Sequence, residues 1–138
     1  MKRLLIACVL GAVIFGCAPA GTGPSEADAA ETVDYAGAFV KGQEARAWMS
    51  SGSNHMFEAS DETCKKVIED LYGLGAVEVR VTDASKVSEE SPGEIAATLM
   101  AKLPADPAKR QALFAYEKEA MADTDSDTKR DYVEIVFD

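Results

Sequence analysis

The sequence contains few of the residues from which metal centres and nucleophilic active sites are built. His55 is the only histidine among 138 residues, so no second histidine can join it in a zinc site of the Cys and His type. The Gly-x-Ser-x-Gly pattern of serine hydrolases is missing. Cys64 falls on the apolar face of an expected helix, where a thiol becomes less acidic and less reactive. Catalysis by a histidine-activated nucleophile is therefore not expected.

The chain also lacks clustered positive charge and long apolar runs. It has 14 basic against 24 acidic side chains, a formal net charge of -10. Nucleic acid is not an expected partner, because binding it requires Lys and Arg to neutralise phosphates. No apolar run is long enough to span a bilayer, yet 47% apolar residues is too many for a disordered chain. One folded domain is the expectation.

The first residues have the pattern of an export signal. Lys2 and Arg3 give a short positive region, and the uncharged apolar stretch Leu4–Phe15 follows it. A helix of that stretch would reach about 18 Å, against about 30 Å for the hydrocarbon core of a bilayer. The stretch is therefore interpreted as the apolar region of a signal peptide rather than as a membrane-spanning helix.

The segment Ile14-Phe15-Gly16-Cys17 resembles the lipobox of bacterial lipoproteins. In that family a branched apolar residue lies three positions before the cysteine, and a small residue lies directly before it. The resemblance implies cleavage between Gly16 and Cys17 and acylation of the Cys17 thiol, with palmitate as a typical chain. The alternative is an ordinary secretory signal, cleaved after Ala18 or Ala20. Ala18 in place of Asp implies, by the sorting rule of enteric bacteria, the outer membrane rather than the inner.

These signals divide the chain into three expected parts. Residues 1–16 are the signal peptide, residues 17–32 the lipidated cysteine with a flexible tether, and residues 33–138 a single domain. Loss of Lys2 and Arg3 with the signal leaves 12 basic and 24 acidic side chains, a net charge of -12. A lipid on Cys17 would leave Cys64 without a disulfide partner.

Hydrophobic periodicity and helix-capping residues predict the elements of this domain. Helices are expected over 41–49, 61–72, 92–103 and 107–121, and strands over 54–59, 76–82 and 132–137. Ser60, Ser91 and Asp106 are the expected N-caps of the last three helices. Glu117 interrupts the apolar stripe of the last helix.

The predicted fold class is α+β, with a small three-stranded sheet, a fourth strand left open, and helices packed on one face. The strands over 54–59 and 76–82 flank a helix, so they are expected to be parallel partners in a β-α-β crossover. The segments LYGLGAVEVRVTD and LPADPAKRQALFAYEKE are similar to a group of small uncharacterised bacterial proteins. That resemblance implies no activity and no site residues.

The acidic segment DTDSDTKRDYVE resembles the calcium-binding loop of an EF-hand. Asp123, Asp125, Asp127, Asp131 and Glu134 stand at positions 1, 3, 5, 9 and 12 of that loop, where oxygen ligands suit a hard dication. Thr128 replaces the turn glycine, and Arg130 replaces the apolar residue at position 8. Glu134 also falls inside the expected last strand. The alternative is that this segment is a solvent-exposed connection between a helix and a strand, since such a connection is also rich in acidic residues and binds no metal.

The sequence thus favours a lipid-anchored protein of the bacterial cell envelope whose small acidic domain is a binding or accessory module and not an enzyme. Its expected partners are the membrane, through the lipid, and a basic protein attracted by the negative charge. No cofactor is expected. Two alternatives remain open: a calcium-binding module that uses the loop 123–134, and a carboxylate-based cell-wall hydrolase. Glu89 with Glu90 and Glu117 with Glu119 are neighbouring acids without a further pattern, and any two acids of the chain could serve such a hydrolase.

Overall fold

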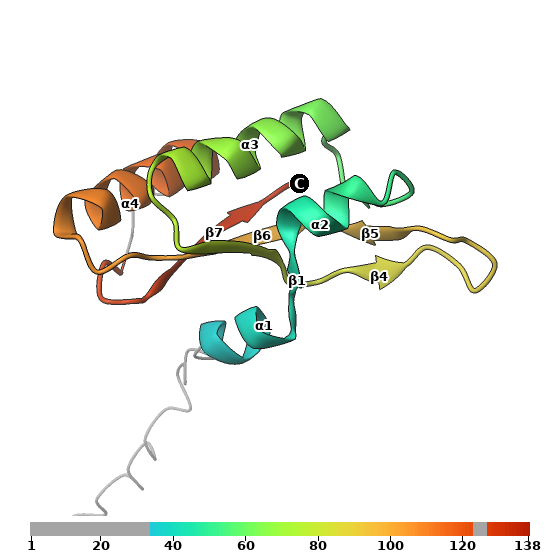
Figure 1. Cartoon of the computed structure of the whole chain (residues 1–138), viewed down its shortest axis with the longest axis horizontal. Coiled ribbons are helices and arrows are strands. Elements are labelled where there is room, and N and C mark those ends of the chain that lie inside the picture. Colours follow the sequence, from blue (N-terminus) through green and yellow to red (C-terminus); the bar gives the residue numbers. More distant parts are fainter. Residues whose placement is uncertain (1–33, 123–126) are drawn as a thin grey trace, which may run out of the picture. The chain divides into compact units, whose positions relative to one another are not determined.

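The structure, a computed structural model, describes residues 34–122 and 127–138, which belong to the compact unit Val33–Asp138 (Figure 1). In chain order the described elements are α1 (Tyr35–Lys41), β1 (Gln43–Glu44), α2 (Ala45–Ser50), β2 (His55–Met56), α3 (Asp61–Gly73), β3 (Glu78–Val81), β4 (Ser85–Lys86), β5 (Glu94–Ala96), β6 (Thr98–Lys102), α4 (Pro107–Met121) and β7 (Tyr132–Val136). None of these helices is long and apolar enough to cross a membrane.

The strands form two sheets, which confirms the predicted α+β class. The larger sheet has four strands in the order β1-β3-β6-β7, and every neighbouring pair is antiparallel. The smaller sheet has the order β2-β5-β4, with β2 parallel to β5. The expected β-α-β crossover was wrong, because β2 and β3 lie in different sheets. The parallel partner of β2 is β5, which lies within the helix expected over 92–103.

Helices cover both faces of the larger sheet, whereas one covered face was expected. α2, α3 and α4 lie on one face, and α1 lies on the other (Figure 1). The Phe39 ring of α1 is 4.9 Å from the Tyr132 ring and 5.0 Å from the Arg80 guanidinium. Arg80 and Tyr132 alternate along their strands with residues that point to the other helices, so α1 packs on the opposite face.

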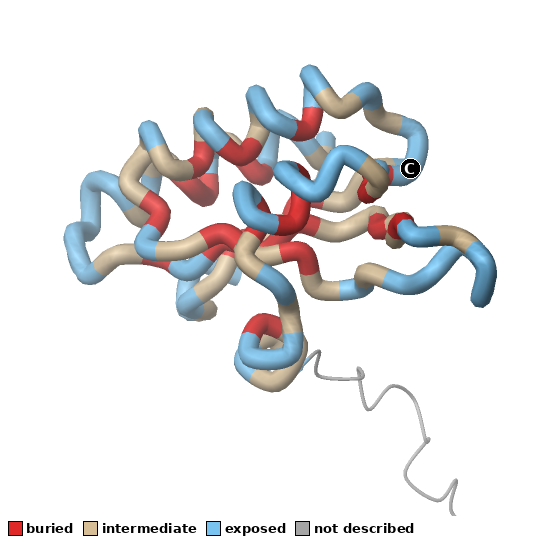
Figure 2. The backbone as a smooth tube through the Cα atoms, turned by 45° about the vertical axis from the view of Figure 1, so that its right-hand side comes forward, coloured by how far each residue is buried: buried red, intermediate tan, exposed pale blue. Residues whose placement is uncertain are grey.

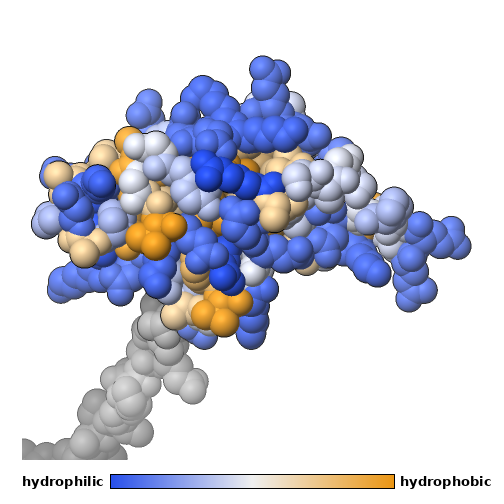
Figure 3. All heavy atoms as spheres, viewed as in Figure 1, coloured by the Kyte–Doolittle hydropathy of each residue, from blue (hydrophilic) through white to orange (hydrophobic). Residues whose placement is uncertain are grey.

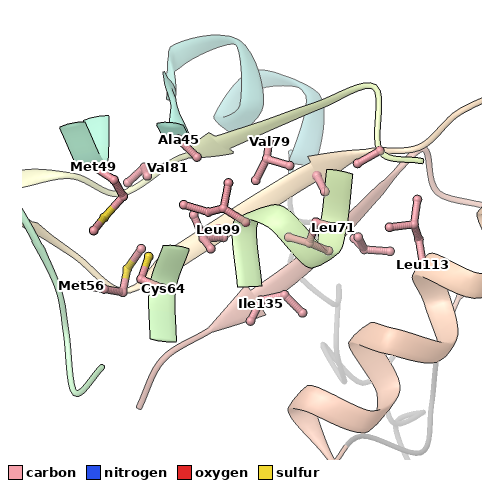
Figure 4. Packing of buried hydrophobic residues seen from close by; sticks show 14 of the residues in the cluster. Ala45, Met49, Met56, Cys64, Leu71, Val79, Val81, Leu99, Leu113 and Ile135 are labelled. Atoms are coloured by element: carbon pink, nitrogen blue, oxygen red, sulfur yellow. The ribbon is translucent and has the colours of Figure 1, made fainter. Parts of the chain in front are cut away.

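The hydrophobic core lies between the larger sheet and the three helices α2, α3 and α4 (Figure 4). In β3 and β7 every second residue is buried in this core, which agrees with the alternation that predicted strands over 76–82 and 132–137. The helices contribute residues at helical spacing. The largest fully buried side chains of this core are Ile68, Leu71, Leu99, Leu113, Val79, Val81, Val133 and Cys64, whereas Met100, the register partner of Arg80, is buried on the other face.

Two of the expected helix starts are confirmed by their caps. The Ser60 hydroxyl accepts a hydrogen bond from the Thr63 amide at 3.1 Å, and the Asp106 carboxylate accepts one from the Lys109 amide at 3.0 Å. Beyond the end of α3, Gly75 takes a φ of 102°, which favours glycine and turns the chain into β3. The Gly73-Leu74-Gly75 segment therefore ends a helix.

The helix expected over 92–103 was wrong, because these residues form β5 and β6. Ser91 does not cap a helix; its hydroxyl accepts from the Gly93 amide within a local turn. The Glu94 carboxylate accepts from the Trp48 indole at 2.8 Å and from the Gln43 side-chain amide at 2.9 Å. β6 is central and buried on both faces, so its continuous apolar run lacks the alternation that indicates a strand.

Candidate functional site

Three residues singled out from the sequence lie outside the described residues. They are Cys17, the expected lipidation site, and Asp123 and Asp125, the first two ligands of the expected calcium loop. Their roles stay predictions. The second half of the loop, which includes Asp127, Asp131 and Glu134, is described and can be built up from its contacts.

Asp127 and Asp131 are exposed, and both accept hydrogen bonds from the protein itself. The Asp127 carboxylate accepts from the Lys129 amide at 2.9 Å, which closes a local turn. The Asp131 carboxylate accepts two N–H groups of the Arg110 guanidinium, each at 3.2 Å. Arg110 also donates to the Arg130 carbonyl oxygen at 2.8 Å, so the first turns of α4 hold the segment that enters β7.

Arg130, the residue that departs from the calcium-loop pattern, forms the most enclosed ion pair of the described residues. Its guanidinium donates to the Glu117 carboxylate of α4, and the two side chains are only 16% and 8% exposed. The same guanidinium lies 5.5 Å from the Phe114 ring and 5.6 Å from the Tyr35 ring. Arg130 therefore joins α1, α4 and the start of β7.

The other oxygen of Glu117 protects the edge of the larger sheet. β7 is an edge strand, so half of its amides have no strand to donate to. The Glu117 carboxylate accepts the Glu134 amide at 2.7 Å, and the Met121 sulfur accepts the Val136 amide at 3.2 Å. Two side chains of α4 thus cover the open side of this strand.

The side chain of Glu134, the expected last calcium ligand, lies in a partly desolvated and negative environment. Burial raises the pKa of this carboxyl, and the nearby Glu117 charge raises it further, while Arg130 acts in the opposite direction. Glu134 belongs to β7 rather than to a loop or an exit helix. In the described segments, no group of three or more His, Cys, Asp and Glu residues is placed to hold a metal ion.

The neighbouring acids noted in the sequence differ in their exposure. Glu117 is buried and Glu119 is exposed on the same helix, while Glu89 and Glu90 are both exposed in the connection between β4 and β5. The acid that Glu117 acts on is Glu134, 17 residues away in the chain: Glu117 accepts its amide, and the Glu117 charge raises the pKa of its carboxyl. Sequence spacing could not reveal this pair, although Glu117 on an apolar stripe was a signal of a buried carboxylate.

An open groove of about 290 Å³ lies between α2 and α3, with Met49 and Ile68 among its lining residues. Its one acidic lining residue is Glu69, whose carboxylate accepts two hydrogen bonds from Arg46 at 2.8 Å and 2.7 Å. Glu117 and Glu134 are not among the residues that line it. The groove therefore lacks the two acids that glycoside hydrolysis requires.

His55 and Cys64 are not arranged as a catalytic base and the cysteine nucleophile that it would activate. The His55 Nδ1 atom lies 3.1 Å from an Asp61 carboxylate oxygen, and both side chains are largely exposed. Cys64 is a free and fully buried cysteine, and burial together with the Asp61 charge raises its thiol pKa to about 11. At neutral pH this thiol stays protonated and a poor nucleophile.

No protein-family model matches the chain, and no match was found among curated proteins or among solved structures. The function therefore has to be inferred from the residues themselves.

We expect Glu117→Ala to destabilise the domain by about 3–5 kcal/mol, because it leaves the Arg130 charge enclosed without its partner. Replacing both partners, by Glu117→Leu with Arg130→Met, is expected to recover part of this loss. Urea unfolding followed by the fluorescence of Trp48, the only tryptophan and 3% exposed, measures both effects.

Glu119→Ala is the matched control, because Glu119 is an exposed glutamate two residues further along the same helix. Its cost should stay within about 0.5 kcal/mol. Equal costs for Glu117→Ala and Glu119→Ala would contradict the structural role of the ion pair.

Proposed function

We propose that this chain is a lipid-anchored protein of the bacterial cell envelope whose acidic domain binds a basic protein partner and has no catalytic activity of its own. The observation that carries the anchoring is the segment Ile14-Phe15-Gly16-Cys17 directly after an uncharged apolar stretch. Because stable membrane attachment takes more than one acyl chain, the proposal requires a multiply acylated Cys17. The sequence after Cys17 favours the outer membrane over the inner.

The organisation of the domain supports this proposal. Every buried apolar residue that the structure describes lies between Phe39 and Ile135. Most of these residues form one hydrophobic core within the compact unit Val33–Asp138. A domain of this kind can be carried at the end of a tether.

The charge of the domain supports a basic partner. The chain has ten more acidic than basic side chains, and acids such as Glu58, Glu62, Glu89 and Glu90 are exposed. Hydrophilic residues dominate the face seen in Figure 3, with separate hydrophobic spots. A negative field of this kind speeds encounters with a cationic protein and repels anionic ones.

A binding role also fits the chemistry of the described side chains better than catalysis does. The buried thiol of Cys64 has a raised pKa, and the enclosed carboxylate of Glu117 is neutralised by Arg130. The groove between α2 and α3 holds one acid, which is bound to Arg46. These groups stabilise the fold and leave no activated nucleophile or acid pair in that groove.

Acylation of Cys17 is tested by growing bacteria that express the chain with a labelled fatty acid. The wild-type chain should incorporate label and sediment with membranes, whereas Cys17→Ser should lose the label and its membrane association. Cys64→Ser is the matched control and should behave as wild type, because Cys64 is buried in the core. Label in Cys17→Ser, or a wild-type chain released unlabelled, would refute the anchor.

The basic partner is tested by cross-linking the chain in living cells and measuring the association with the purified cross-linked protein. We expect a protein of basic isoelectric point, whose association weakens severalfold between about 50 and 200 mM salt because screening shortens the reach of the negative field. An association whose strength is unchanged by salt would overturn the electrostatic part of the proposal.

A further inference from the structure

The small sheet β2-β5-β4 has one face toward the core and one face away from it. The side chains of Met56 on β2 and Ala96 on β5 are buried, and these two residues are register partners. The next register row runs across all three strands through His55, Ile95 and Ser85. Because side chains alternate along a strand, this row points to the opposite face, and His55 and Ser85 are exposed as that requires.

Three apolar side chains lie on this outer face. Phe57 follows His55 by two residues and keeps the strand pattern, since its amide donates to the Ala96 carbonyl at 2.6 Å. Val87 follows Ser85 by two residues. Both residues lie directly after their strands, where alternation continued by one residue puts them on the face of Ile95, and they are 47% and 64% exposed. We name Phe57, Ile95 and Val87 the outer patch; it runs diagonally across the three strands with Ile95 in the central strand.

Negative charge surrounds the outer patch. Glu58 is the direct neighbour of Phe57, and Glu89 and Glu90 follow Val87 in the connection between β4 and β5; all three are exposed. Most of this connection is drawn as exposed in Figure 2. Lys86 is the one base within β4 and β5, and the imidazole of His55 faces the Asp61 carboxylate. An apolar centre with an acidic rim complements a partner that has apolar side chains flanked by lysine or arginine.

We propose that the outer patch is the surface with which this domain binds its basic partner, through a segment that carries apolar residues between basic ones. This inference rests on the proposed binding function and names its surface. A second copy of the chain is a poorer occupant, because it would bring the rims with Glu58, Glu89 and Glu90 against each other. Exposed apolar side chains elsewhere, Val40 on α1 and Val77 before β3, lie outside this surface.

The test uses residues 17–138 with Cys17→Ser, which keep the compact unit Val33–Asp138 whole. The probe is a fluorescent synthetic peptide with a short apolar centre between two lysine runs, and anisotropy measures its affinity. We expect the double variant Phe57→Ser with Val87→Ser to weaken binding about tenfold or more. The matched control, Val40→Ser with Val77→Ser, removes apolar groups that are at least as exposed on average and should change binding less than about twofold.

Amide shifts of the wild-type chain give a readout that needs no variant. Addition of the peptide should move the amide signals of residues 55–57 and 85–87 more than those of α1 or α4. Peptides with serine in the centre or glutamate in the flanks should bind more weakly, the first from loss of apolar contact and the second from repulsion.

Two results would overturn the assignment of the surface. The first is equal loss in the outer-patch variant and the control variant. The second is absence of binding, or shifts that centre on another element. Either result leaves the proposed function standing if the association with the cross-linked partner still weakens with salt. A salt-insensitive partner would instead refute the proposed function, whatever the peptide does.

Discussion

The enclosed ion pair between Arg130 and Glu117 holds the last helix of this domain against the segment that enters its last strand. It lies where α4, the segment entering β7 and Tyr35 of α1 meet. Glu117 uses its second oxygen to accept the Glu134 amide, so one carboxylate neutralises a cation and also satisfies an edge strand. Breaking such a pair is costly because the remaining charge stays enclosed, whereas replacing both partners by apolar residues of similar size costs less. The ion pair therefore determines how α4 and the segment entering β7 lie against each other, and its net contribution to the free energy of unfolding is not large.

A second set of polar contacts joins the two sheets. Glu94 on β5 accepts from Trp48 of α2 and Gln43 of β1, while the buried Asn54 accepts the Glu94 amide and donates to the Trp48 carbonyl. Asp83 accepts the amides of Ala97 and Thr98, where β5 gives way to β6. The side chains of Asn54 and Asp83 thus accept backbone amides of β5 and of the junction between β5 and β6 that would otherwise have no partner. They also hold the small sheet so that the outer patch faces away from the core.

Much of the fold follows from local chemistry that the sequence shows directly. Ser60 and Asp106 predicted the starts of α3 and α4, and the alternating valines predicted β3. The residues of β6 could not be assigned in the same way, because a central strand covered on both faces loses its alternation and reads as a helix. The short elements α1 and β1 depend on contacts with Arg80 and Tyr132, which are distant in the chain.

In the candidate site, too, the sequence predicts local features but not contacts between distant residues. The sequence drew attention to the acidic segment before β7 and to Glu117 on an apolar helix stripe. It could not show that Arg130 and Glu117 meet, because the two residues come from different elements and no helical or strand period relates them. The outer patch could not be predicted from the sequence either. Its residues belong to or directly follow three strands, and both outer strands pair with β5, for which the sequence predicted a helix.

The central claim is that protein contacts, and not a metal ion, hold residues 127–131, which lead into β7. Its most direct test is thermal melting of residues 17–138 with Cys17→Ser in calcium, in magnesium and in chelator at one ionic strength. Because Asp131 is bound to Arg110 and Glu134 lies in a partly desolvated strand, we expect no calcium-selective rise in Tm. A site with a Kd near 10⁻⁴ M would add about 1.8 kcal/mol in roughly 2 mM calcium, or about 7–14 °C. A calcium-selective rise of that size, abolished by Asp123→Ala, would contradict the account and identify a calcium-binding module.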